Sequence, residues 1–369
     1  MGGRQYFRQI KNMNKRVASL HRACWAKTIV VLVISLFCQL LFAQSRLPVK
    51  WWKPTLSNIY VSSLSPSGLY QALGGDAGVQ IVSPTSGSIL KNLQTSVLTV
   101  RCLAFSPDSL HLAVGGFNPY SGAGRLELWN TATGQIEHEI TTASSVSSLS
   151  FSSDGNQLIY PSNPNLIQFL NVATFNPITS LKTHAVTTLT SIALSPDGST
   201  LAIGGLKQNS PVVELWNSNS LLYIQDLDVP FLGPFTLDYG PRTLAFTPDG
   251  KTLVNLESLS QMGLFGNTAY CYLEFWDFST PGKIRSYQSY GYGCEATSMT
   301  LSQDGNLLGL TGYYYLTESE GRIIYGSVGV ADLIRISDAS TTARLVTNTT
   351  SSNAIWFSKD GSTVYSSGY

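Results

Sequence analysis

The sequence has little of what most catalytic and metal sites are made of. Only 12% of its 369 residues are charged, and four are histidine. It has no Cys-x-x-Cys pair, which excludes a zinc knuckle and a thioredoxin-type motif, and no Gly-x-Ser-x-Gly elbow of a serine hydrolase. Glycine pairs such as Gly204-Gly205 lack the lysine and the following helix of a phosphate loop. We therefore predict a protein that is not an enzyme and that has no cofactor and no metal site.

Long apolar runs are rare as well, and the clearest one stands near the N-terminus. Thr28 to Phe42 is almost wholly apolar and follows seven basic residues and no acidic one. Because this run is shorter than the ~20 residues that span a bilayer as a helix, residues 1–43 are predicted to be a signal peptide cleaved after Ala43. An uncleaved N-terminal membrane anchor and a lipoprotein signal at Cys38 are the alternatives. We expect an exported protein (periplasmic, extracellular or in the cell envelope), with a membrane-anchored one as the alternative.

Basic charge is scarce outside this leader. Without residues 1–43, the chain has 16 basic and 22 acidic residues, a net charge of −6. Nucleic-acid binding needs a basic surface that neutralises phosphates. The composition therefore argues against a nucleic-acid partner, and contact with a membrane is expected only through an uncleaved leader.

What the sequence does have is a repeated turn. The cleanest copy is Ser195-Pro196-Asp197-Gly198, which lies between two runs of alternating apolar residues and predicts a hairpin. Counted from Ser67, the turns are separated by 41, 46, 43, 52, 55 and 56 residues, a period typical of a propeller. The seven copies begin at Ser65, Ser106, Ser152, Ser195, Thr247, Ser302 and Ser358.

A second pattern follows each turn, a third strand that ends in Trp-Asn, Trp-Asp or a variant. Examples are Leu126 to Asn130, Val213 to Asn217 and Leu273 to Asp277, and we align Ile334 to Asp338 with them in the sixth unit. With these turns and strand ends, the chain resembles the WD-repeat β-propeller family, in its bacterial form with S-P-D-G turns. No unit has the Gly-His dipeptide of that family, so its histidine-centred hydrogen-bond network is expected to be absent.

The resemblance implies an all-β fold, a seven-bladed β-propeller over residues 44–369. The seventh unit has only two predicted strands before Tyr369, and an open sheet edge is prone to aggregation. We expect this incomplete last blade to be closed by an N-terminal strand within Arg46 to Lys53. A truncated reading frame is the alternative.

Long segments between the second and third strands, and between units, are predicted to be loops on one face of the disc. Those of units four to six are rich in tyrosine and phenylalanine, residues typical of binding surfaces. We predict a scaffold that binds a protein, a peptide or a surface polymer there. The alternative is an extracytoplasmic hydrolase or lyase that uses carboxylates of the same face. The predicted binding residues are Phe231, Phe235, Tyr239, Phe265, Tyr290, Tyr292, Tyr313, Tyr314 and Tyr315.

Two further sets of residues are expected to be structural. Cys271 and Cys294 could form a disulfide in an oxidising compartment, or remain two separate thiols. The aspartates of the repeated turns are expected to bond to their own backbone rather than to bind calcium. These are Asp108, Asp154, Asp197, Asp249, Asp304 and Asp360. The oligomeric state does not follow from the sequence.

Overall fold

A computed structural model of the chain describes one compact unit, Leu47–Tyr369, with gaps. The predicted leader, residues 1–43, lies outside the described residues. All regular elements of the described part are β-strands, and we find there no helix that could cross a membrane. The described residues are 49–51, 59–76, 78–208, 210–227, 229, 236–263, 266–280, 283–292, 294–317, 323–346 and 352–368.

Six of the sheets have four antiparallel strands each, which pair in chain order, and we call them blades 1 to 6. Blade 1 consists of β2 (Ile59–Leu64), β3 (Gln71–Gly75), β4 (Gly78–Val82) and β5 (Ile89–Leu93). Blade 2 consists of β6 (Thr99–Phe105), β7 (His111–Phe117), β8 (Gly124–Asn130) and β9 (Ile136–Thr142). Blade 3 consists of β10 (Ser150–Phe151), β11 (Gln157–Asn163), β12 (Leu166–Asn171) and β13 (Pro177–Lys182). Blade 4 consists of β14 (Thr188–Leu194), β15 (Thr200–Lys207), β16 (Ser210–Asn217) and β17 (Leu222–Leu227). Blade 5 consists of β18 (Thr236–Phe246), β19 (Thr252–Gly263), β20 (Gly266–Thr280) and β21 (Lys283–Tyr292). Blade 6 consists of β22 (Cys294–Leu301), β23 (Leu307–Thr317), β24 (Ile323–Arg335) and β25 (Thr341–Val346).

The remaining sheet, which we call the closing sheet, joins the two ends of the described chain. It consists of β26 (Ser352–Phe357), β27 (Val364–Gly368) and β1 (Val49–Trp51). Val49 pairs with Val364, and β1 runs parallel to β27. The strand expected within Arg46 to Lys53 therefore pairs with the last unit, in a parallel orientation unlike that of any strand pair within blades 1 to 6.

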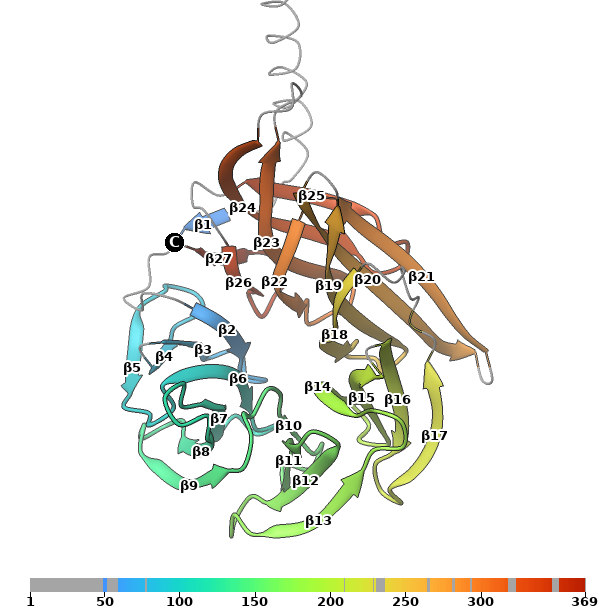
Figure 1. Ribbon diagram of the computed structural model, residues 1–369. Helices are drawn as coiled ribbons and strands as arrows, with labels where there is room; N and C mark the ends of the chain where they lie inside the picture. The colour runs from blue at the N-terminus through green and yellow to red at the C-terminus, as the bar shows by residue number, and fades with distance from the viewer. Residues whose placement is uncertain are drawn as a thin grey trace, which may run out of the picture. The chain divides into compact units, whose positions relative to one another are not determined.

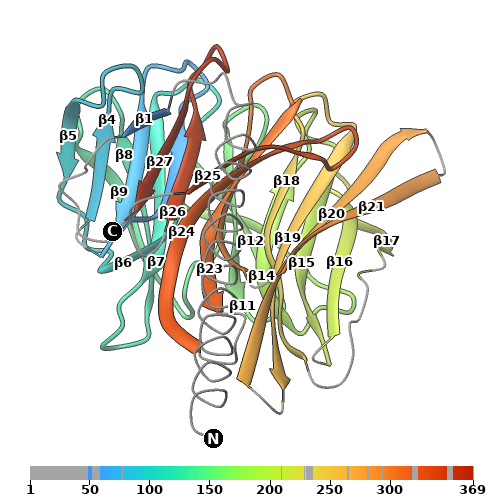
Figure 2. The same ribbon diagram turned by 90° about the horizontal axis from the view of Figure 1, so that it is seen from above.

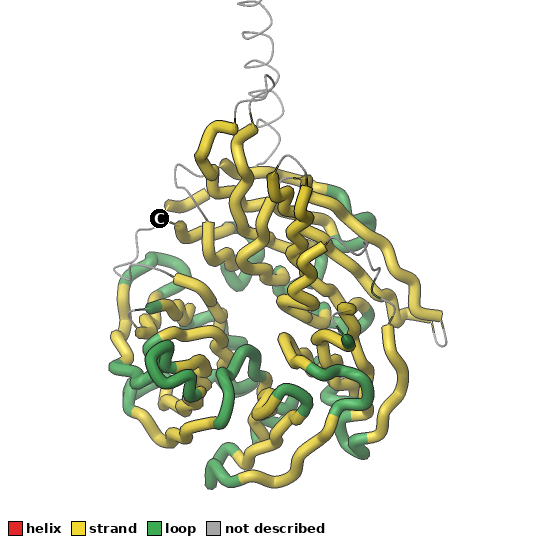
Figure 3. Tube along the Cα trace, viewed as in Figure 1, coloured by secondary structure: helices red, strands yellow, loops and turns green. Residues whose placement is uncertain are grey.

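The sheets are arranged as a β-propeller. In Figure 1 the first strand of each blade faces the centre and the fourth strand lies at the rim, and Figure 2 shows the same strands from the side. The first strands contact one another in chain order, and β2 also contacts β26 of the closing sheet. In Figure 3 this unit consists of strands joined by turns and loops, and no described residue is helical.

Apolar cores fill the space between neighbouring sheets rather than one common centre. The core between blades 1 and 2, for example, combines Ile81 of β4 with Leu103 and Leu112 of blade 2. The closing sheet has such a core on both sides: Trp356 packs with Leu73 of blade 1, and Ile355 packs with Leu333 of blade 6. Each sheet is thus held mainly by its two neighbours.

The repeated turns share one hydrogen-bond pattern. In the fourth copy the Ser195 hydroxyl donates to Asp197 Oδ1 at 2.5 Å, and the backbone N–H of Ser199 donates to the same oxygen at 3.0 Å. The Ser195 oxygen in turn accepts from the backbone N–H of Thr200 at 2.9 Å. Asp108, Asp154, Asp249, Asp304 and Asp360 likewise accept from the first hydroxyl of their own turn.

These bonds predict a loss of stability in acid. The Ser195 hydroxyl holds the pKa of Asp197 below its usual value, and the Ser358 hydroxyl lowers the pKa of Asp360 to about 2. A carboxyl group whose pKa is lower in the folded than in the unfolded state stabilises the fold above its unfolded pKa of about 3.9, and this stabilisation disappears as the pH falls towards about 2. Asp197→Asn with Asp360→Asn should therefore flatten the fall of the melting temperature between about pH 5 and pH 2. An unchanged slope would contradict this, and Ser86→Ala, on the exposed surface, is the control.

A buried acidic residue lies three positions before the end of the third strand in blades 2, 4 and 6. The Glu127 carboxylate, fully buried, accepts from the Thr95 hydroxyl at 2.6 Å, the backbone N–H of Ser96 at 2.8 Å and the Trp129 indole at 2.8 Å. Thr95 and Ser96 belong to the connection that leads into blade 2. The carboxylate therefore fastens this connection to the blade, a role that the sequence analysis missed.

Blade 6 shows that one strand end was wrongly aligned. Leu307 pairs with Arg335, as Thr200 pairs with Asn217 in blade 4, so the third strand ends at Arg335 rather than at Asp338. Asp332 then takes the position of the buried glutamate, and it forms an ion pair with Arg344, with Nε to Oδ1 at 2.8 Å. Asp338 instead belongs to the next turn, where it accepts from the backbone N–H of Ser340 at 3.0 Å.

Candidate functional site

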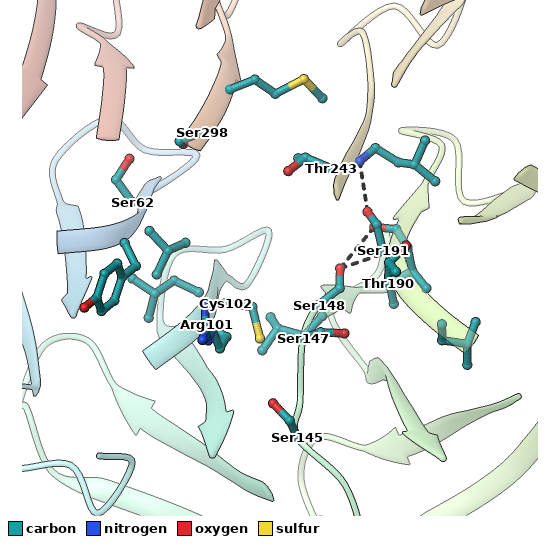
Figure 4. Close-up of a pocket in the computed structure, with 18 of the residues that line it drawn as sticks. Ser62, Arg101, Cys102, Ser145, Ser147, Ser148, Thr190, Ser191, Thr243 and Ser298 are labelled. Atoms are coloured by element: carbon teal, nitrogen blue, oxygen red, sulfur yellow. Dashed lines mark hydrogen bonds between the residues drawn. The ribbon is translucent and has the colours of Figure 1, made fainter. Parts of the chain in front are cut away.

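A pocket of about 730 Å³ lies at the centre of the propeller, between the first strands of the blades. Figure 4 shows its lining, which comes from β2, β6, β14, β18 and β22 and from the connection before β10. Most of the polar groups are hydroxyls: Ser62, Ser145, Ser147, Ser148, Thr190, Ser191, Thr243 and Ser298.

Some of these hydroxyls join neighbouring blades. The Ser191 oxygen accepts from the backbone N–H of Leu244 at 2.9 Å, and the Ser148 oxygen accepts from that of Ile192 at 3.2 Å (Figure 4). The first bond links the first strands of blades 4 and 5, and the second links the connection before β10 to the first strand of blade 4. The residue four positions before the repeated turn is small and hydroxylated in blades 3 to 6, which explains how this ring of hydroxyls arises from the repeat.

Arg101 is the one charged residue among the described residues that line the pocket. Its guanidinium lies 5.3 Å from the centre of the Phe117 ring and 6.0 Å from that of Tyr60, distances at which a cation is attracted to an aromatic face. The Tyr60 hydroxyl donates to Asp76 at 2.6 Å, which fixes the ring. A positive group held between two rings and surrounded by hydroxyls suits a carboxylate or another polar acceptor on a ligand.

Cys102 also lines the pocket, but it is no candidate nucleophile. Its thiol is buried and donates to the backbone carbonyl of Val146 at 3.3 Å. Burial raises the pKa of the thiol well above its usual value. Because the thiolate is the reactive form, Cys102 acts as a small core residue.

The segments predicted to carry the binding aromatics are strands rather than loops. The structure places the backbone of Tyr239 in β18 and that of the tyrosines at 290, 292 and 313–315 in β21 and β23. Phe231, Phe235 and Phe265 lie outside the described residues. The loop assignment is wrong: these segments are rich in tyrosine and other residues that favour strands, and they continue the strands of blades 5 and 6.

The hairpins of blades 5 and 6 are drawn out by these segments. β19 and β20 have 12 and 15 residues, and β23 and β24 have 11 and 13. The corresponding strands of blade 2 have 7 residues each, so a blade of this protein forms with strands of that length. Blades 5 and 6 therefore extend beyond the others on the side where second and third strands are joined.

Cys271 and Cys294 lie on strands of two different sheets, β20 and β22. Their side chains are outside the described part, so the disulfide remains a prediction. Of the histidines, His111 lies 3.1 Å from Glu137, and the His138 ring stacks on Phe175 with 5.2 Å between the ring centres. His184 lies beside Glu214 and Asp226 in blade 4, a grouping that the sequence analysis did not foresee.

Comparison with known proteins supports the repeat. Residues 87–130 and 175–210 match the family model described as "WD domain, G-beta repeat". These two segments are similar to WD repeats. A curated relative, the anaphase-promoting complex subunit cdh1 of Dictyostelium discoideum, is 33% identical over 120 residues. The match covers 32% of this chain and only 15% of the length of that relative.

A solved structure supports the fold over a longer stretch than the WD repeats. The hydrazine synthase of Kuenenia stuttgartiensis matches with a TM-score of 0.68 at 15% identity, over 87% of this chain and 95% of that chain. At this identity the likeness concerns the fold alone.

Proposed function

We propose that the chain is an exported WD-repeat propeller of seven blades, of the type with S-P-D-G turns, that binds a protein or peptide partner without catalysis. Residues 1–43 are its signal peptide in this proposal. The observation that carries the binding role is the elongation of the hairpins in blades 5 and 6. Blades 1 to 4 form with shorter strands, so the fold itself does not require the extra length.

The closing sheet supports the seventh blade. It packs against blade 1 through Trp356 and Leu73 and against blade 6 through Ile355 and Leu333. Its first strand, β26, contacts β2 and β22, the first strands of both neighbours. These contacts favour counting the closing sheet as the seventh blade of the proposed ring, although it has three strands.

The elongated hairpins and the central pocket are on the same face of the propeller. In an antiparallel meander the second-to-third hairpins share a face with the connections between blades. Ser145 and Ser147, in the connection between blades 2 and 3, line the pocket. A partner that contacts the tyrosines of blades 5 and 6 could therefore also reach Arg101. The described lining residues include no histidine or carboxylate that could act as a general base, which favours binding over catalysis.

A capture experiment tests this proposal. The variant with Tyr313→Ala, Tyr314→Ala and Tyr315→Ala should capture roughly tenfold less partner than the unchanged chain from the native envelope fraction. Clustered tyrosines supply much of the free energy of a binding surface. Tyr120→Ala is the matched control, since Tyr120 is an exposed tyrosine of blade 2, outside the proposed region. The mass of the chain purified from the same fraction should show loss of residues 1–43. Equal capture by both variants would contradict the binding face, and a retained leader would contradict cleavage.

A further inference from the structure

One polar residue of each third strand, buried in every blade except blade 3, faces a partner on the fourth strand. Like charges directly opposite each other destabilise a sheet. Four blades avoid this. The facing residues are two amides in blade 1, an amide and a hydroxyl in blade 3, an acid and an amide in blade 5, and an acid and an arginine in blade 6. Blades 2 and 4 place two acids opposite each other. From blade 1 to blade 6 the pairs are Gln80 with Asn92, Glu127 with Glu139, Gln168 with Ser180, Glu214 with Asp226, Glu274 with Gln288, and Asp332 with Arg344.

In blade 2 an arginine of the same strand compensates the two acids. The Arg125 guanidinium donates to Glu139 at 2.7 Å and to the Ser96 hydroxyl oxygen at 2.8 Å. The Ser96 hydroxyl in turn donates to Glu127. A positive charge therefore lies next to both carboxylates.

Blade 4 has no such arginine. Val212, which is buried, occupies the position that Arg125 has in blade 2. Among the residues that the structure describes, no lysine or arginine forms an ion pair with Glu214 or Asp226. The group that lies there instead is the imidazole of His184, and one ligand atom each of His184, Glu214 and Asp226 lie within 4.8 Å of one another.

The two carboxylates differ in how they are bonded. Glu214, fully buried, accepts from the backbone N–H groups of His184 at 3.1 Å and Val186 at 2.7 Å, from that of Ala185, and from the Trp216 indole at 2.8 Å. These four donors fix the position of the Glu214 carboxylate. In contrast, Asp226 Oδ1 is buried and accepts no hydrogen bond from the described residues. A buried carboxylate oxygen with no hydrogen-bond donor, beside a second carboxylate, is a position where a bound cation would supply the missing partner.

We propose that His184, Glu214 and Asp226 bind a divalent transition metal ion of the Zn²⁺ type. One imidazole nitrogen and two carboxylate oxygens are ligands that Zn²⁺ prefers, and the ion would neutralise the facing acids as Arg125 does in blade 2. The Zn²⁺ site extends beyond the proposed partner binding and does not depend on it.

The surroundings allow the three ligands to close around an ion. Bonds of about 2.0–2.2 Å place the ligand atoms of tetrahedral Zn²⁺ about 3.3–3.6 Å apart, so the present spacing has to shorten by up to about 1.5 Å. His184 is exposed, so its side chain has room for this movement. Its ring stacks on Tyr223 with 4.4 Å between the ring centres, so the tyrosine keeps the imidazole near the two carboxylates.

Calorimetric titration of the untagged full-length chain with ZnCl₂ tests the site. We expect saturable binding of about one Zn²⁺ per chain at this site and a rise in the melting temperature with Zn²⁺ concentration, as for any ligand of the folded state. Asp226→Asn and His184→Ala should each weaken binding by roughly 10–100-fold or more and abolish most of this rise. His184→Ala changes an exposed side chain, and Asp226→Asn keeps the shape of the side chain. Circular dichroism checks that both variants fold.

Matched variants in blade 2 make the result specific. Glu139→Gln, at the position equivalent to Asp226, and His111→Ala, beside Glu137, should bind Zn²⁺ like the unchanged chain. Absence of saturable binding would overturn the site. Zn²⁺ binding that survives Asp226→Asn and His184→Ala, or that is lost in His111→Ala, would overturn it as well.

Discussion

Glu127→Ala should lower the free energy of unfolding by about 3–5 kcal/mol, the cost of leaving buried partners of a removed charge unsatisfied. The carboxylate is fully buried, and it accepts from the Thr95 hydroxyl, the backbone of Ser96 and the Trp129 indole. Alanine leaves these donors without an acceptor and removes the hydrogen bonds that hold the connection before blade 2 against the blade. Urea denaturation of the purified chain measures the effect.

Two variants of the same blade separate this role from a general effect of charge. Glu127→Gln keeps the shape and one acceptor, so we expect an intermediate loss of about 1–2 kcal/mol. Glu139→Ala removes a half-exposed carboxylate whose ion pair with Arg125 is worth about 1 kcal/mol at most. If Glu127→Ala costs no more than Glu139→Ala, the buried glutamate does not fasten the blade.

Replacement of residues 47–53 by a Gly/Ser linker of equal length should destabilise the propeller and promote self-association. β1 pairs with β27 at Val49, Lys50 and Trp51. Loss of about three backbone hydrogen bonds at about 1 kcal/mol each would lower the stability by about 3 kcal/mol, and the melting temperature by roughly 5–10 °C. The uncovered edge of β27 would be free to pair with another chain. Calorimetry and light scattering measure the two effects.

Rescue with a peptide distinguishes strand closure from an unrelated effect of the linker. A synthetic peptide of residues 46–53 should restore the melting temperature and the monodisperse state of the linker variant, because an added strand can complete an open sheet edge. A peptide with the same composition in scrambled order is the control. A linker variant that melts like the unchanged chain would contradict closure of the ring by β1.

The repeat made the fold predictable from the sequence. Seven turns in register, each with a proline, aspartate or glycine in its place, indicated the number and order of the hairpins. The strand end of blade 6 was misplaced because Ile334 to Asp338 has the apolar alternation and final acid of the pattern. The true end at Arg335 has neither an aromatic nor an acidic residue, and only pairing with Leu307 reveals it.

The candidate sites were much less predictable. The hydroxyls of the central pocket are spread from Ser62 to Ser298, and although four of them share one position of the repeat, only the fold shows that this position faces the centre. His184, Glu214 and Asp226 come together because a connection between blades passes beside a strand pair of the next blade. The long hairpins are predicted as loops because their length exceeds that of the other strands.

The cross-strand pairs also make the blades non-interchangeable, although their backbones repeat. Were the fourth strand of blade 4 to dock in blade 6, Asp226 would face Asp332 in place of Arg344. Such a mismatch of two facing acids would penalise this strand exchange during folding, so the facing side chains help blade 6 to select its own outer strand.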